Sequence, residues 1–182
     1  MDSKLELRFN QLENSRLQLL AELEKRDDKE LNFHPGKDKW SVIQVMHHLI
    51  IIEQLSIGYI NKKLTYKTNI NKSGFGSAIR VFVLTLILKM PFRFKAPKIV
   101  SEVPDNSDLN ETKNQWDQVR KEMQELFDNL PEDFLNKNIF KHALAGKMNI
   151  YQMLSFMEEH FKHHVKQIDR IARRFDTRNE KQ

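Results

Sequence analysis

Two histidines on one predicted helix are the residues of this chain whose types and spacing best suit chemistry. His160 and His164 are four positions apart. Because each residue of an α-helix is turned by about 100°, positions four apart lie on one face. Apolar residues continue that face at Met157 and Ile168. The two imidazoles therefore occupy the buried stripe of an amphipathic helix, where both rings could bind one metal ion.

Two histidines alone are not enough to predict a metal site, and a third ligand is needed. A bare H-x-x-x-H recurs by chance and lacks the glutamate that makes H-E-x-x-H informative. A single histidine in such a stripe is more often an ordinary core residue. Catalytic zinc-type sites use three protein ligands and keep one position open, so a third ligand must come from another helix.

The best candidate for that ligand is His48. Ser41 and Gln44 form a capping box that predicts the start of a helix, and the apolar stripe of this helix passes beside His48. His47 aligns with other apolar positions of the same helix and remains an alternative. Glu53 lies just over one turn beyond His48, where a solvent-facing side chain is favoured over a further ligand or a partner of a ligand.

The remaining histidines are less suited to the site. His163 is rotated by about 100° from His164 around the helix and therefore lies outside the apolar stripe. His34 precedes a proline in a turn and is expected at the surface. His142 lies outside the predicted helices, where a surface position or a loop hydrogen bond is favoured.

Four long helices account for most of the chain. With only 5 Gly and 5 Pro, the sequence favours long uninterrupted elements over a turn-rich β fold. Apolar periodicity predicts an all-α four-helix bundle with helices at about 3–26, 41–63, 107–129 and 150–175. Ser107 or Asp108 can cap the third helix and Asn149 the fourth. We expect one domain over residues 1–176, with an insertion at 64–106 between the second and third helices, and a flexible tail at 177–182.

The insertion carries an apolar run from Val81 to Leu88, bracketed by Arg80 and Lys89. A bilayer span needs about 20 apolar residues, so no transmembrane helix is expected. A buried helix or the face of a homodimer is favoured for this run. A lid over the metal site and an interfacial membrane helix are the open alternatives.

Composition excludes several classes of protein. The chain has no cysteine, so disulfides, thiolate ligands and cysteine nucleophiles are excluded, and a cytoplasmic location is expected. The net charge is +5, but basic residues are interleaved with acids and no nucleic-acid-binding module is recognisable. We therefore expect no nucleic-acid partner.

The order and spacing of these motifs resemble the DinB-like superfamily. Trp40-Ser41 followed by His48-Leu49, and then His160-x-x-x-His164-x-x-Gln167-Ile168, carry the resemblance, together with the stretch 94–98. It covers roughly residues 5 to 175. The superfamily contains four-helix bundles, among them bacillithiol S-transferases and, more distantly, mycothiol-dependent maleylpyruvate isomerases. The resemblance implies that His48, His160 and His164 bind a divalent metal, and it implies no role for Gln167.

This ligand set leads to a functional hypothesis. Three neutral imidazoles suit zinc or nickel, with iron or cobalt as alternatives, better than magnesium or calcium. The resemblance favours an enzyme that transfers a low-molecular-weight thiol to an electrophilic small-molecule substrate through a metal-bound thiolate. A hydrolase that uses metal-bound water and a non-catalytic bundle acting through dimer or partner contacts are the alternatives. No catalytic side chain beyond the ligands is identified.

Overall fold

The computed structural model describes residues 1–66, 70–89 and 98–180, and its main body is a bundle of four long helices. These are α1 (Ser3–Leu23), α3 (Val42–Tyr66), α5 (Leu109–Asp128) and α6 (Ile150–Asn179). Each turns an apolar stripe inward, and α3 packs on α5 and α6 while α1 packs on α6 and α5. The predicted all-α four-helix bundle is confirmed.

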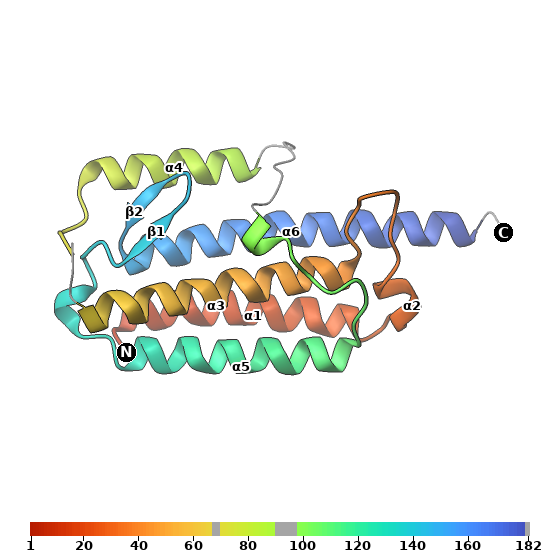
Figure 1. Cartoon of the computed structure of the whole chain (residues 1–182), viewed down its shortest axis with the longest axis horizontal. Coiled ribbons are helices and arrows are strands. Elements are labelled where there is room, and N and C mark those ends of the chain that lie inside the picture. The colour runs from red at the N-terminus through yellow and green to blue at the C-terminus, as the bar shows by residue number, and fades with distance from the viewer. Residues whose placement is uncertain (67–69, 90–97, 181–182) are drawn as a thin grey trace.

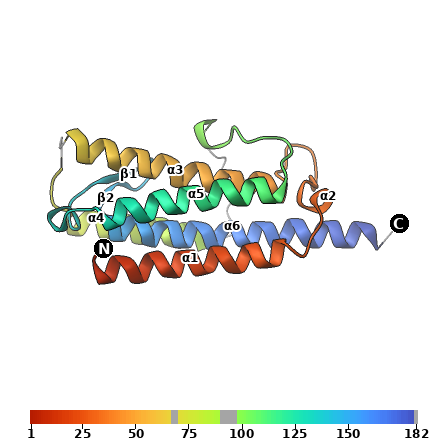
Figure 2. The ribbon, with the colours of Figure 1, turned by 90° about the horizontal axis from the view of Figure 1, so that it is seen from below.

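The bundle contains two pairs of neighbouring helices that run in parallel. In Figure 1 and Figure 2, α1 and α6 run one way along the bundle, and α3 and α5 run the other way. Parallel neighbours need a connection that returns along the length of the bundle. The chain between α3 and α5 makes this return through α4 (Phe75–Lys89) and the short helix η1 (Lys98–Val100). The segment that the sequence presents as an insertion at 64–106 is therefore a crossover connection that the topology requires.

Capping interactions set where the long helices begin. At the start of α3, Ser41 and Gln44 exchange backbone-to-side-chain hydrogen bonds of 3.2 Å, as the capping box predicts. Asp108 caps α5, and Asn149 caps α6 in a second capping box with Gln152. These caps fix the starts of α3 and α6, the two helices that carry the candidate ligands.

The short elements depart from the sequence-based expectation. A two-stranded antiparallel hairpin, β1 (Phe140–His142) with β2 (Gly146–Met148), occupies part of the segment expected to be a linker. Two short helices, α2 (Asp28–Leu31) and η2 (Glu132–Phe134), lie in the other connections. Helix α6 continues to Asn179, so the first three residues of the expected tail at 177–182 are helical, and residues 181–182 lie outside the described part. Residues 94–97 of the family-like stretch also lie outside it.

The apolar run at 81–88 lies in α4, which packs against α6 and β2. Val81 and Leu84 are buried there. Within the described residues, no helix is both long enough and apolar enough to cross a membrane.

A buried ionic network joins α1, α3 and α5, and it corrects the expectation that Glu53 faces solvent. Glu53 is only 4% exposed. Its carboxylate accepts hydrogen bonds from Trp116 Nε1 at 3.0 Å and Arg120 Nη2 at 2.8 Å. Glu13 on α1 lies 3.5 Å from the Arg120 guanidinium and also pairs with Arg16. Glu53 is thus an internal anchor of the bundle, pointing at α5 and away from the histidines of α6.

Replacing Glu53 by alanine should lower the free energy of unfolding by about 3–5 kcal/mol, because Arg120 would keep a buried charge without its nearest carboxylate. Urea unfolding measures the change. The matched control is Glu125→Ala on the exposed side of α5, expected to alter stability by less than about 0.5 kcal/mol. Equal effects of the two substitutions would contradict the assigned role of Glu53.

Candidate metal centre

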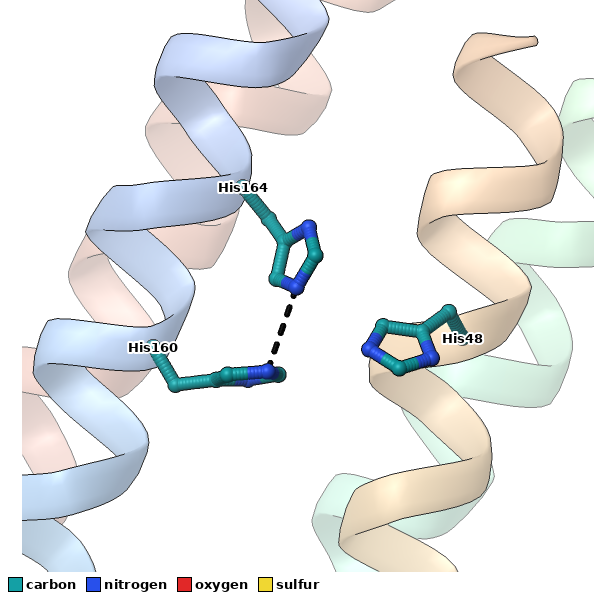
Figure 3. A group of neighbouring side chains, drawn as sticks. All are labelled: His48, His160 and His164. Atoms are coloured by element: carbon teal, nitrogen blue, oxygen red, sulfur yellow. Dashed lines mark hydrogen bonds between the residues drawn. The ribbon is translucent and has the colours of Figure 1, made fainter. Parts of the chain in front are cut away.

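Three histidines from two helices converge at the centre of the bundle. His48 lies in the second turn of α3, and His160 and His164 lie on successive turns of α6. One ring nitrogen from each lies within 4.8 Å of the others. Figure 3 shows the His48 ring pointing from α3 across to the two α6 rings. Within the described part of the chain, this is the one group of three or more potential ligands that could hold an ion.

The two α6 nitrogens already have the spacing of metal ligands. His160 Nε2 and His164 Nε2 are 3.1 Å apart. With metal–nitrogen distances of about 2.0–2.1 Å, this separation gives an N–metal–N angle of about 100°, between the octahedral and tetrahedral values. The candidate ligand atom of His48 lies within 4.8 Å of both of these nitrogens. The donor set therefore fits one divalent ion.

Hydrogen bonds on the far side of two rings select the tautomer that a metal requires. His48 Nδ1 donates to the carbonyl oxygen of Val100 in η1 at 2.7 Å, since a carbonyl can only accept. His164 Nδ1 donates to Gln167 Oε1, one turn later on α6, at 3.0 Å. Both rings therefore keep the lone pair on Nε2. Such partners of metal-binding histidines orient the ring and raise its basicity.

Burial keeps all three imidazoles neutral at physiological pH. Loss of solvent lowers the pKa of His48 and outweighs the opposing effect of its hydrogen bond to Val100. Burial, reinforced by repulsion from neighbouring histidines, lowers the pKa of His160 well below its usual value and that of His164 to about 3. Metal ions bind neutral imidazole, so protons do not compete for the site near neutral pH.

Aromatic rings enclose the cluster on two sides. The Trp40 ring lies 5.0 Å from that of His48, measured between centroids. On the other side, Phe156 lies 5.4 Å from His160, and His142 lies 4.5 Å from Phe156. His48 and His164 are buried, whereas His160 is partly exposed. Of the three candidate ligands, His160 is therefore the one with appreciable solvent-exposed surface.

The other histidines have separate surroundings. His47 is buried towards α5, where its Nε2 lies 3.3 Å from Thr112 Oγ1, so the preference for His48 over His47 agrees with the geometry.

His163 stands edge-on to His164 and lines a hollow between α1 and α6. His34 bonds the carbonyl of Lys39 in its turn. His142 Nδ1 accepts the backbone N–H groups of Leu144 and Ala145, as expected for a loop hydrogen bonder.

Sequence reasoning missed the two hydrogen-bond partners of the ligands. Gln167 could have been found, because it follows His164 by three positions on the same helix and such positions are neighbours. Val100 could not, because its carbonyl acts through the backbone and lies 52 residues from His48.

Comparisons with known proteins agree with this fold. The family model of the DinB superfamily matches residues 11–168. The uncharacterized protein YuaE of Bacillus subtilis (strain 168) is 22% identical over 162 residues, which is 89% of this chain and 95% of YuaE. The structure of Bacillus subtilis YfiT, described as a probable metal-dependent hydrolase with an unusual four-helix bundle topology, superposes with a TM-score of 0.59. That superposition covers 97% of this chain and 90% of YfiT at 18% identity, a likeness of fold.

The depressed histidine pKa values predict acid sensitivity of the metal-free protein. An unfolded histidine binds a proton near pH 6.5, whereas folded His164 does so only at about pH 3. Between these values the unfolded state holds more protons, so the free energy of unfolding falls as the pH is lowered through this window. Each such histidine contributes about 1.4 kcal/mol per pH unit.

Urea unfolding in the presence of a chelator, at successive pH values across this window, measures the slope. His164→Gln should flatten it, whereas His34→Gln, at a histidine in an exposed turn, should leave it unchanged. The same slope in the parent protein and in His164→Gln would disprove the contribution assigned to His164.

Proposed function

We propose that this protein, which belongs to the DinB superfamily, is a metal-dependent enzyme that holds one divalent ion at His48, His160 and His164. The observation that carries the proposal is the convergence of three imidazoles from two helices, two of them buried and each of these two with its tautomer fixed by a hydrogen bond at Nδ1. Buried polar groups are costly unless they are satisfied. A bound ion would satisfy all three Nε2 atoms together.

The donor set favours a transition metal. Imidazole nitrogens suit zinc, nickel, iron and cobalt, whereas magnesium and calcium prefer oxygen. Three neutral ligands leave the full charge of the ion in place and at least one coordination position open. When bound, such an ion lowers the pKa of a coordinated water or thiol to near neutrality. We expect zinc or nickel, with iron or cobalt as alternatives.

Hydrolysis is the first reaction to test. YfiT, which shares the fold, is described as a probable metal-dependent hydrolase. In this chain, the hydrogen bonds that His48 and His164 donate to Val100 and Gln167 hold the ligand rings in place, and the Trp40 and Phe156 rings restrict water around them. A substrate would enter beside the partly exposed His160.

Thiol transfer is the second candidate, favoured by the resemblance of the histidine motifs to those of thiol-dependent family members. The chain has no cysteine, so the thiol must be an external small molecule. The same open position would bind either the thiol or water.

We expect untagged protein to bind one equivalent of Zn²⁺ or Ni²⁺, measured by titration calorimetry and by elemental analysis after gel filtration. His48→Ala, His160→Ala and His164→Ala should each weaken binding by more than about 100-fold, because each removes a direct ligand. His47→Gln and His163→Gln are the matched controls on the same two helices and should bind normally. Retention of metal by all three alanine variants, with circular dichroism unchanged, would rule out the site.

Gln167→Leu should lower metal affinity by about 10–100-fold without changing the stoichiometry, because His164 would lose the acceptor that fixes its tautomer. Gln167→Glu keeps an acceptor oxygen at this position and should restore affinity. Competition with a chromophoric chelator measures both variants. Equal affinity of Gln167→Leu and the parent would show that Gln167 does not position His164.

One assay separates the two reactions. Metal-loaded protein is incubated with ester and amide substrates, and separately with an electrophilic dye plus a panel of small thiols. Turnover without thiol that is absent in His160→Ala identifies a hydrolase, and turnover that requires a thiol identifies a transferase. No turnover in either arm, despite bound metal, would overturn the enzymatic proposal in favour of a non-catalytic bundle.

A further inference from the structure

Helix α4 has two apolar faces, and within the described part of the chain one is buried and the other is largely exposed. Val81 and Leu84 are buried towards α6 and the hairpin. The opposite face carries four large apolar side chains that are 45–62% exposed, spaced i, i+3, i+4 and i+7: Ile79, Phe82, Val83 and Leu86. A surface helix normally turns polar residues outward. A contiguous exposed apolar face therefore indicates a surface that contacts something else.

The exposed face continues onto neighbouring elements. Arg80 Nε donates to the carbonyl of Ala145 at 2.9 Å, which holds the hairpin turn against α4. Leu144 in that turn is 75% exposed. We call Ile79, Phe82, Val83, Leu86 and Leu144 together the α4 face.

The segment of the chain that contains α4 carries charge of one sign. From Gln54 to Ser101 the sequence holds nine basic residues and no acidic residue, which leaves 21 basic and 25 acidic residues in the rest of the chain. The whole excess of positive charge is thus in the segment that contains α4, and the remainder of the protein is net acidic. Such asymmetry indicates a binding partner of opposite charge.

The hairpin beside α4 adds positive charge at a cost to its own stability. Lys141 and Lys147 are exposed and directly opposite each other across the two strands. Like charges in this arrangement repel. Among the described residues, neither lysine has a carboxylate within ion-pair distance. An anionic partner would relieve the repulsion between these two lysines. Lys137, which pairs with Lys72 across a β-bridge, already has an ion pair with Asp133 at 2.6 Å.

We propose that the α4 face is an interfacial membrane-binding surface that inserts its apolar side chains into a bilayer rich in anionic phospholipids. Apolar side chains flanked by lysine and arginine are the pattern of helices that lie in the plane of such an interface. Anionic headgroups attract each nearby basic residue. A second copy of this chain fits less well, because a symmetric contact would bring two segments with nine basic and no acidic residues together.

The chain segment that carries α4 also contacts the candidate metal centre. Ile99 in η1 is 69% exposed, and the next residue, Val100, accepts the hydrogen bond from His48. The same crossover segment thus carries the α4 face and orients one candidate ligand. The proposal does not depend on the metal-dependent activity.

Co-sedimentation with lipid vesicles tests the proposal on the full chain. We expect binding to vesicles of equal parts phosphatidylcholine and phosphatidylglycerol, and little binding to phosphatidylcholine alone or in high salt. Phe82→Ser should lower partitioning by about tenfold or more. Lys141→Gln with Lys147→Gln should lower it by roughly fivefold for each charge removed. The matched control is Leu17→Ser, which removes a side chain of 48% exposure on α1, away from the basic segment.

Two results would overturn the proposal. The first is equal partitioning of Phe82→Ser, Leu17→Ser and the parent, with all three folded by circular dichroism. The second is a stable dimer in analytical ultracentrifugation that Phe82→Ser dissociates, with no vesicle binding by the parent. The second result would assign the α4 face to a homodimer.

Discussion

The convergence of three neutral imidazoles between α3 and α6 is the constraint on which the rest of the structure depends. Loss of solvent lowers the pKa of all three rings, and repulsion from His48 lowers those of His160 and His164 further, so protonated forms are disfavoured. His48 is held from behind by the Val100 carbonyl and His164 by Gln167. His48 and His164 thus turn unprotonated Nε2 atoms towards His160, whose Nε2 lies 3.1 Å from that of His164, and neutral imidazole is the form that metal binding requires.

The order and direction of the helices help to hold His48 in position. Because α3 and α5 are parallel neighbours, the chain must return along the bundle between them. This returning segment brings η1 beside α3, where the backbone carbonyl of Val100 accepts the hydrogen bond from His48. On the other side of α3, Glu53 bonds Trp116 and Arg120 of α5. Helix α3 is therefore fixed on both flanks, with His48 turned towards α6.

Local sequence patterns predicted the parts of the site that depend on one helix at a time. The spacing of His160 and His164, the capping boxes at Ser41 and Asn149, and the stripe that favoured His48 are all properties of single helices. The sequence-based predictions were wrong where the position of a residue depends on a partner far away in the sequence. Glu53 looked exposed because its partner Arg120 is 67 residues away. The hairpin was missed because three-residue strands are too short to show alternation, although Gly146 with φ of 71° marks its turn.

X-ray absorption spectroscopy of protein loaded with one equivalent of Zn²⁺ or Ni²⁺ tests whether the three histidines bind the ion. We expect a shell of nitrogen ligands at about 2.0–2.1 Å with the outer-shell scattering of three imidazoles. In His48→Ala the imidazole scattering should decrease by one third, whereas in His47→Gln it should not change. A first shell dominated by carboxylate or water oxygen, or a spectrum unchanged in His48→Ala, would contradict the assignment of a three-histidine metal centre.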